Sequence, residues 1–530
     1  MRQATETAIG IQKGQASGRA VSSLIANKRT KGDWRGTGER ASSEVTRDGE
    51  AVVLAERSTD GRAIGRPGRW GSETQATHWR EGEAGHNVLS ERKMRETQNS
   101  PIISTDLRQI AEQAKSDPAK VFIALAHRMD VDFLLEAYHR VRQDGAPGLS
   151  GVTAKEYAND LMANLEDLHG RLKSQQYVAP KIKRVWIDKD GGKKKRPIGL
   201  TEFEDKIVQK AVSMLLGAVY EQDFYDFSHG FRDGHSAHQA LKEIRDECMK
   251  YGINWLIDAD ISGFFDNIDK ERAKDIIRQR VNDGGLLRLI GKWLNAGVVE
   301  GDVISYSEKG TPQGGVISPM LANIYLHEVL DGWFVKEVKP RMKGYCFIVR
   351  FADDFIIGCQ YEEDARRIME VLPKRFDRFG LSIHPEKTKL IPFGRPAFGE
   401  ATGKGEATFD FLGFTHYWAK SRKGNWVIKR KTAKKKVRKA IVEMRRWCRN
   451  NRHKPLWWQY RILSSKLRGH FQYFGIRCNM QAMEAVLHYV IRGWKYWLSR
   501  RSHKSAISWA AFEKLLEKHP LPTPRIIHNV

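Results

Sequence analysis

The chain has 530 residues, more than one hydrophobic core usually serves, so we expect roughly two to four domains. Lysine and arginine number 90 against 64 aspartates and glutamates, and the formal charge of +26 favours a polyanionic partner, nucleic acid before an acidic membrane surface. No apolar run approaches the ~20 residues that span a bilayer. Five cysteines without a CxxC pair argue against a disulfide scaffold and a zinc finger, so we expect a reduced, intracellular protein.

Residues 1–100 differ in composition from the rest of the chain. They hold 13 of the 46 glycines, no Phe, Tyr or Cys, and 12 Leu, Ile and Val residues. This is too little apolar surface to offset the entropy of ordering a chain. We expect a mostly disordered extension, or alternatively an over-long reading frame with initiation near Met94.

From residue 101 onwards the pattern is that of a folded protein. Apolar residues that recur every three or four positions predict four helices: 107–143, 154–174, 201–222 and 362–379. Short apolar or alternating runs predict four strands: 181–187, 253–261, 346–351 and 355–359. The polar residues 188–192 read as a hairpin turn.

Three amphipathic stripes near the C-terminus predict a small helical bundle. Their members are Val437, Ile441, Met444 and Cys448, then Leu463, Leu467, Phe471 and Phe474, and finally Met483, Val486, Val490, Trp494 and Trp497.

A dense basic run overlaps the first stripe. Residues 429–454 contain 13 Lys or Arg and one acid, Glu443. Like charges at this density repel one another without a polyanion, so we favour nucleic-acid contact over a merely solvated helix face. The candidate RNA-binding residues are Lys434, Lys435, Lys436, Arg438 and Lys439. The nearby Trp447, Trp457 and Trp458 offer either core packing or base stacking.

Two acidic clusters stand where strands are expected. Asp258 and Asp260 follow an apolar run, and Asp353-Asp354 lies between two apolar strands. Carboxylates in strands among hydrophobic neighbours are costly unless something compensates them, and a divalent cation would do so. Mg²⁺ is typically held by one or two carboxylates plus substrate phosphates, and a pair of ions ~4 Å apart serves in-line phosphoryl transfer. For either cluster alone, the alternative is a turn or a helix N-cap.

Further blocks surround the acidic clusters. In chain order they are Lys-Lys-Lys-Arg-Pro-Ile-Gly at 193–199, Ser-His-Gly-Phe-Arg at 228–232, Gly-Thr-Pro-Gln-Gly-Gly-Val-Ile-Ser-Pro at 310–319, Gly-Leu-Ser-Ile-His-Pro-Glu-Lys-Thr-Lys at 380–389 and Phe-Asp-Phe-Leu-Gly-Phe at 409–414. The Gly and Pro residues of 310–319 fix a tight backbone beside a helix start, where free N–H groups favour phosphate.

This order of blocks resembles the reverse transcriptases of bacterial group II introns, which also act as splicing maturases. The resemblance runs from about residue 130 to the C-terminus. Residues 142–148 resemble the family's extra N-terminal block, 467–475 the core of its maturase-specific thumb, and 521–528 its terminal segment.

The resemblance implies an α+β right-hand polymerase with fingers, a palm built on an antiparallel sheet, and a helical thumb. The implied divisions are the extension at 1–100, the N-terminal block and fingers at 101–250, the palm at 251–425, the thumb at 426–500 and a tail at 501–530 without an endonuclease domain.

The resemblance also implies roles for single residues. Asp260, Asp353 and Asp354 would be catalytic and, with the carbonyl of Ile261, would bind two Mg²⁺ ions. Phe265 would be the bulky gate that rejects a 2′-hydroxyl, or else a core residue. The other nucleotide-binding residues would be Lys189, Arg196, Gln313 and Lys387, and the primer grip would be Phe411, Leu412, Gly413 and Phe414. Lys193–Lys195 compete with Lys189 for the triphosphate, Gln313 has a helix cap as its alternative, and His235 and His238 read as ordinary polar residues.

The implied function is an RNA-directed DNA polymerase that copies intron RNA into DNA for mobility and binds that RNA to assist its splicing. Its partners would be group II intron RNA, an RNA template with a DNA primer, deoxynucleoside triphosphates and a DNA target, in the bacterial cytoplasm and without a membrane. Three alternatives stay open. A splicing cofactor with a dead polymerase site is disfavoured by the intact carboxylates, and an RNA-dependent RNA polymerase by Phe265. A reverse transcriptase recruited to host defence is disfavoured by the block at 467–475.

Overall fold

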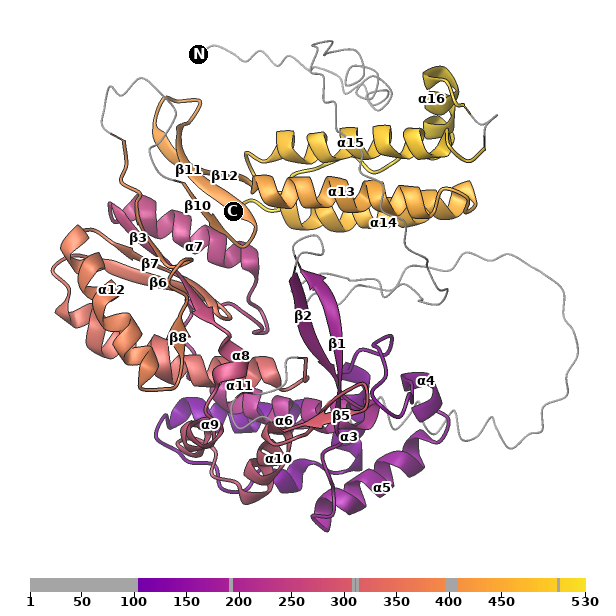
Figure 1. Cartoon of the computed structure of the whole chain (residues 1–530). Helices are drawn as coiled ribbons and strands as arrows, with labels where there is room; N and C mark the ends of the chain where they lie inside the picture. The colour runs from indigo at the N-terminus through magenta and orange to yellow at the C-terminus, as the bar shows by residue number, and fades with distance from the viewer. Residues whose placement is uncertain (1–102, 190–193, 307–309, 311–313, 397–407, 503–505) are drawn as a thin grey trace, which may run out of the picture. The chain divides into compact units, whose positions relative to one another are not determined.

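The computed structural model describes residues 103–189, 194–306, 310, 314–396, 408–502 and 506–530 (Figure 1). The predicted disorder of residues 1–100 and the alternative start at Met94 lie outside these residues. The described residues fall into two compact units. The larger unit runs to Lys439 and takes in Ile476–Asn479 and Ile526–Val530, and the smaller comprises Ala440–Gly475 and Met480–Arg525.

The larger unit begins with helices. Residues 103–116 are helical, and they are followed by η1 (Ala126–Arg128), α3 (Val131–Arg140), α4 (Ala154–Tyr157), α5 (Leu161–Lys173) and α6 (Phe203–Tyr220). The single helix expected over 107–143 is therefore wrong, and the one expected over 154–174 is divided. Pro118, which lacks an N–H donor, stands two residues after the end of the first helix. The Asp130 side chain begins α3 by accepting from the Phe133 N–H at 2.8 Å.

A five-stranded antiparallel sheet forms the centre of the larger unit. Its strands are β3 (Trp255–Ser262), β6 (Cys346–Phe351), β7 (Asp354–Cys359), β8 (Ser382–Ile383) and β9 (Lys389–Pro392). The order is β6-β7-β3-β8, and β9 also pairs with β3. Strands β3, β6 and β7 confirm the expected runs closely, because each is a short apolar segment bounded by polar or turn residues.

Helices α7 (Ala237–Lys250) and α12 (Glu362–Asp377) pack against this sheet, and further helices connect its strands. These further helices are α8 (Phe264–Asn267), α9 (Lys270–Arg278), α10 (Gly284–Leu294), α11 (Ser318–Leu326), the π-helical η2 (His327–Gly332) and η3 (Phe334–Val338), and η4 (Lys339–Arg341). The amphipathic α12 packs through Phe376, whose ring stacks on Phe355 of β7 with 6.2 Å between centroids. The core is continuous from the N-terminal helices to this sheet.

A second sheet has the order β2-β1-β4-β5. Its strands are β1 (Ile182–Lys189), β2 (Lys194–Leu200), β4 (Val298–Glu300) and β5 (Val303–Ser305). The antiparallel β1-β2 pair confirms the predicted hairpin, in which Lys189 stands opposite Lys194 and Arg196 opposite Ile187. Most of the predicted turn lies outside the described residues.

A third sheet, β10-β11-β12, precedes the C-terminal helices. These elements are β10 (Phe409–Phe411), β11 (Phe414–Lys420), β12 (Trp426–Thr432), α13 (Lys434–Asn450), α14 (Leu456–Phe474), α15 (Met480–Leu498) and α16 (Trp509–Lys518). Most members of the three predicted stripes are buried, so the helical bundle is confirmed. Within the described residues, no helix combines the length and the apolar character needed to cross a membrane.

Candidate active site

The three predicted catalytic carboxylates are brought together by strand pairing. In the β3-β7 ladder Asp260 stands directly opposite Asp354, and Asp353 lies in the tight turn between β6 and β7. Residues opposite each other in an antiparallel pair have Cα atoms only ~4.5–5.5 Å apart. Asp258, two positions before Asp260, projects from the same face of β3 because side chains alternate along a strand.

The pKa values of two of these carboxyl groups, Asp354 and Asp258, are raised. Desolvation by the surrounding protein, together with the charges of Asp353, Asp260 and Asp258, raises the pKa of Asp354 to about 7. Desolvation also raises the pKa of Asp258 to about 6. The Asp354 side chain is nevertheless open to solvent. Negative charge is therefore concentrated at an accessible point, where a cation would relieve the repulsion.

Lys387 supplies one positive charge at this point. Its ammonium forms an ion pair with Asp260 Oδ2, and the same segment is anchored where the His384 N–H donates to the Asp260 carbonyl at 2.8 Å. The long-range contact joins the block at 380–389 to the first acidic cluster, as its predicted role in the site requires.

The donor set fits Mg²⁺, a hard cation that prefers oxygen ligands and usually keeps substrate phosphates among them. Asp260, Asp353 and Asp354 offer carboxylate oxygens. Ile261 follows Asp260 on β3 and can offer only its backbone carbonyl, because its side chain is aliphatic and buried. Over the described ranges, no group of three or more His, Cys, Asp or Glu side chains is arranged to hold an ion unaided.

The turn that carries Asp353 is held by buried residues that the sequence pattern did not predict. Ala352 adopts a left-handed φ of 57°. Arg350 is fully buried and donates to the Ala352 carbonyl at 3.1 Å and to Asp331 at 2.5 and 2.8 Å. Asn323 Oδ1 accepts from the same guanidinium at 3.0 Å. The sequence signal for this contact is an arginine inside the apolar run 346–351. An arginine is almost never fully buried unless it is paired, so Arg350 indicates a buried partner.

The block at 228–232 packs directly against this turn. The His229 N–H donates to the Arg350 carbonyl at 2.8 Å. A Cβ on Gly230 would lie 2.2 Å from the backbone nitrogen of Ala352, so no other residue fits there. The sequence of this block did not by itself predict a role for it.

His235 and His238 have separate partners. The His235 ring contacts His229 with 3.1 Å between their Nδ1 atoms, whereas the His238 ring stacks on His528 with 3.6 Å between centroids. Their interpretation as ordinary polar residues agrees with these contacts.

Close glycine contacts bring the proposed nucleotide-binding blocks together. A Cβ on Gly310 would lie 2.7 Å from the Phe265 carbonyl oxygen, and one on Gly314 would lie 2.4 Å from the Gly199 carbonyl oxygen. Gly310 therefore lies against the residue proposed as the sugar gate, and Gly314 lies against the end of β2. Phe265 itself is half-buried and meets Phe264 edge to face.

The remaining nucleotide-binding candidates are less closely joined to the carboxylates. Arg196 is exposed on β2, in a different sheet from Asp260 and Asp354. The backbone of Lys189 lies on β1, but its side chain is outside the described part of the chain, and so is the whole of Gln313.

The expected primer grip forms the β10-β11 hairpin. Leu412 and Gly413 make its two-residue turn with φ of 49° and 82°, the left-handed conformation that suits the twist of a tight hairpin. Phe411 and Phe414 pair across it and are buried. The phenylalanines thus hold the hairpin in the core, and the turn is the part available for contact.

The basic run at 429–454 is divided between two elements. Lys429, Arg430 and Lys431 belong to β12, and Arg430 is buried, where it donates to the Leu241 carbonyl at 3.0 Å. The expectation of one basic helix face is wrong for this part, because alternation along a strand turns every second residue inward.

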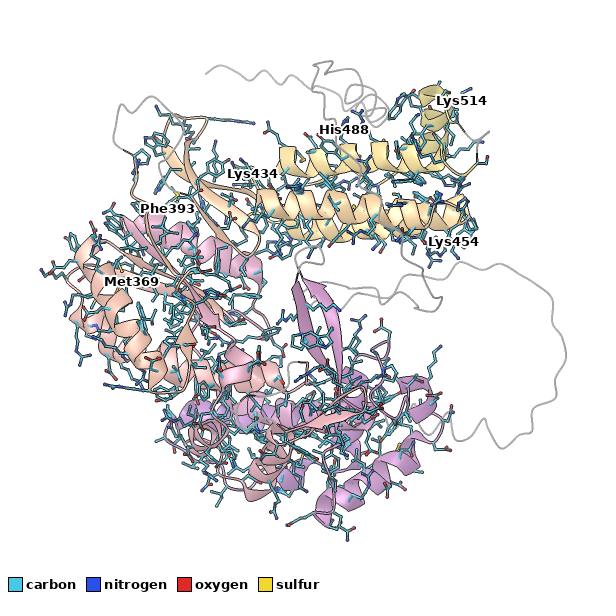
Figure 2. All side chains as sticks on the ribbon, viewed as in Figure 1. Met369, Phe393, Lys434, Lys454, His488 and Lys514 are labelled. Carbon is cyan, nitrogen blue, oxygen red and sulfur yellow. The ribbon has the colours of Figure 1, made fainter. Side chains whose placement is uncertain are left out.

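Most of the five candidate RNA-binding cations are exposed at the start of α13, where Figure 2 labels Lys434. Only Lys439 is half-buried. Trp447 and Trp458 stack on each other with 5.7 Å between centroids, which favours packing for these two, whereas Trp457 is 59% exposed.

Known proteins are similar in sequence to part of this chain. The family model described as reverse transcriptase (RNA-dependent DNA polymerase) matches residues 187–416, which include the carboxylates, the glycine loop and the turn of the β10-β11 hairpin. The group II intron-encoded protein LtrA of Lactococcus lactis subsp. cremoris is 36% identical over 239 residues, or 44% of this chain and 39% of the relative. This chain therefore matches well under half the length of that relative.

Two further relatives extend the comparison. Nuclear intron maturase 1, mitochondrial, of Arabidopsis thaliana is 32% identical over 124 residues, or 22% of this chain and 17% of the relative. Protein YkfC of Escherichia coli is 31% identical over 333 residues, which cover 54% of this chain and 84% of the relative. With the paired carboxylates and the ordered blocks, these matches show that the chain belongs to the reverse transcriptase family, among the group II intron-encoded proteins and intron maturases.

Proposed function

We propose that this protein is an RNA-directed DNA polymerase encoded by a group II intron, and that it also binds the intron RNA to assist splicing. The observation that carries the proposal is the register of β3 and β7, which sets Asp260 opposite Asp354 and beside Asp353. The sheet around these residues would be the palm, β1 and β2 would belong to the fingers, and α13 to α15 would form the thumb or maturase-specific domain. The domain limits are those implied by the sequence.

The reaction would be attack of a primer 3′-hydroxyl on the α-phosphate of a deoxynucleoside triphosphate, which forms a phosphodiester bond and breaks the bond to the departing pyrophosphate. Asp260, Asp353 and Asp354, with the Ile261 carbonyl, would hold two Mg²⁺ ions. When bound, the ions would supply Lewis-acid stabilisation at the attacking and leaving oxygens. The carboxylates would contribute by fixed placement rather than by proton transfer.

Other side chains would bind and orient the nucleotide. Lys387 would move its charge from Asp260 to the phosphates once substrate arrives, or donate a proton to pyrophosphate. Arg196 and Lys189 would hold the triphosphate with charge-assisted bonds. Phe265 would exclude a 2′-hydroxyl by its bulk, Gln313 would line the nucleotide, and the turn Leu412-Gly413 would contact the primer end.

The second activity would need no chemistry from the protein. The exposed cations at the start of α13 would bind phosphates of the intron RNA, and the exposed Trp457 would offer a ring for base stacking. While it holds the intron RNA, the protein would copy that RNA into DNA at a DNA target in the bacterial cytoplasm.

The decisive experiment measures extension of a DNA primer on an RNA template by the full chain. We expect wild type to extend and Asp353→Ala to lose at least about 10³-fold in rate, because several kcal/mol of metal stabilisation are removed. Asp377→Ala, an exposed aspartate at the end of α12, is the matched control and should retain the wild-type rate. Extension by Asp353→Ala at the wild-type rate would remove the active-site assignment.

A further inference from the structure

We propose that Arg350 is a positioning residue, which clamps the Asp353-bearing turn from inside the protein and so sets the spacing of the catalytic carboxylates. The proposal rests on the polymerase function above. It concerns a connected set of buried contacts that reaches the backbone of a single residue, Ala352, through Arg350 and Gly230.

The first contact is direct. Arg350 Nη1 donates to the Ala352 carbonyl at 3.1 Å, one residue before Asp353. Ala352 has a φ of 57°, a conformation that residues with a Cβ adopt rarely and keep only when their surroundings impose it. A hydrogen bond to its carbonyl from a group that is always charged supplies such an imposed restraint.

The guanidinium is itself fixed by Asp331. The pair is bidentate, with Nε to Oδ1 at 2.8 Å and Nη2 to Oδ2 at 2.5 Å, and both side chains are 0% exposed. This fork geometry fixes the plane of the guanidinium, and only that plane directs the remaining N–H groups at the turn. A lysine could neutralise the aspartate but could not hold both partners.

Asn323 connects the clamp to the other side of the turn. Its Oδ1 accepts from Arg350 Nη1 at 3.0 Å, and its Nδ2 donates to the Gly230 carbonyl at 2.7 Å. Gly230 lies against the Ala352 backbone, where a Cβ would be only 2.2 Å away. The turn is therefore held between the guanidinium and the backbone of Gly230.

The helix that supplies Asn323 and Asp331 has an irregularity suited to this task. α11 ends at Leu326, and the chain continues as the π-helical η2, which contains Asp331. A π turn is wider than an α turn, so it advances each residue by a smaller rotation. That change brings Asn323 and Asp331 to one face, and π segments of this kind are frequent at functional sites.

A similar arginine–aspartate pair elsewhere in the larger unit provides a control that distinguishes a positioning role from a general effect on stability. Arg280 forms the same fork with Asp223, at 2.8 and 3.0 Å, and donates to the carbonyls of Ala114 at 3.1 Å and Lys120 at 2.6 Å. It holds backbone in the same way but makes no contact with the catalytic turn. Arg280→Lys therefore reproduces the loss of a buried fork without loss of the clamp.

The test compares Arg350→Lys, Asn323→Ala and Arg280→Lys in the full chain. Each variant is assayed at an equal interval below its own unfolding temperature, for single-nucleotide extension and for Mn²⁺ binding by electron paramagnetic resonance on a dideoxy-terminated primer. We expect Arg350→Lys to lower the maximal extension rate ~10–100-fold, since a misplacement of about 1 Å costs this much. The half-saturating nucleotide concentration should stay unchanged, Mn²⁺ should bind more weakly, and Arg280→Lys should match wild type in both assays.

Wild-type rate and Mn²⁺ affinity in Arg350→Lys would overturn the clamp, and so would equal losses in Arg280→Lys. If Arg350→Lys does not fold, Asn323→Ala decides, because it keeps the buried ion pair and removes the links from Asn323 to Arg350 and to Gly230. Wild-type behaviour there also overturns the proposal. If wild type itself fails to extend a primer, the proposed function fails, whereas the Mn²⁺ comparison still tests the clamp.

Discussion

The catalytic carboxylates and the basic start of α13 are both dense in one sign of charge, but they are built in opposite ways. Asp260, Asp353 and Asp354 meet only because strands distant in sequence pair in register, and buried partners fix the turn between them. The cations of α13 follow one another along a single helix and are mostly exposed. The first arrangement suits chemistry that depends on placement, and the second suits a contact that depends on the number of charges.

Of the changes that test this comparison, removing positive charge from α13 should have the largest effect. Replacing Lys434, Lys435, Lys436, Arg438 and Lys439 by Gln should weaken intron RNA binding by about tenfold to a hundredfold. Because each lost phosphate contact removes ~0.7–0.9 from the log–log salt dependence, the slope should also flatten. The measurement is intron RNA affinity at several salt concentrations.

The control removes five exposed cations from another part of the larger unit. These are Lys336, Lys339, Arg341, Lys374 and Arg378. Equal slopes and affinities for wild type and the α13 variant would make the basic run a solvated helix face, and the RNA site would then be sought around residues 130–175. Extension on a short pre-annealed duplex should fall less than intron binding in the α13 variant.

A smaller effect is expected at the sugar gate, where placement rather than charge is altered. Phe265→Val removes a ring that is half-buried against Phe264. It should raise ribonucleotide incorporation relative to deoxyribonucleotide incorporation by about tenfold or more, which is the range that pocket shape controls. Single-nucleotide extension with each substrate measures this ratio. An unchanged ratio, with intact folding, would return Phe265 to the core.

The smallest effect is expected from the N-terminal segment. Deleting residues 1–93 should change the extension rate by less than about twofold and the unfolding temperature by less than about 2 °C, because this segment has too few apolar residues to pack. Thermal unfolding and primer extension of the shortened chain check both values. A large fall in unfolding temperature would show that the segment is part of the fold.

The elements that sequence patterns predicted well are those with local causes. Strand β6 has the expected bounds because an apolar run of six residues is bounded by turn signals. The same reasoning failed over 107–143, where apolar spacing continued across Pro118 although the helix did not. It also failed at Arg430, because alternation in β12 was hidden by the neighbouring lysines.

The residues of the candidate site also fall into those that local sequence predicts and those that it does not. Asp260 and Asp353 stood out because carboxylates in apolar strands are costly, and their pairing follows once the strands are aligned. Asp331, Asn323 and the π-helical turn could not be found from the sequence, since nothing local marks side chains whose partners lie 19 or more residues away. The hairpin turn at Phe411–Phe414 was not predicted, and the burial of its two rings depends on the third sheet.

The central claim is that chemistry and RNA binding depend on different residues, and the affinity of Asp353→Ala for intron RNA tests it most directly. The measurement is a binding isotherm at three salt concentrations, made in parallel with wild type. We expect the same dissociation constant within about twofold and the same salt slope, because the removed carboxylate contributes no phosphate contact. A binding loss of about tenfold or more in a normally folded Asp353→Ala protein would contradict the separation of the two activities.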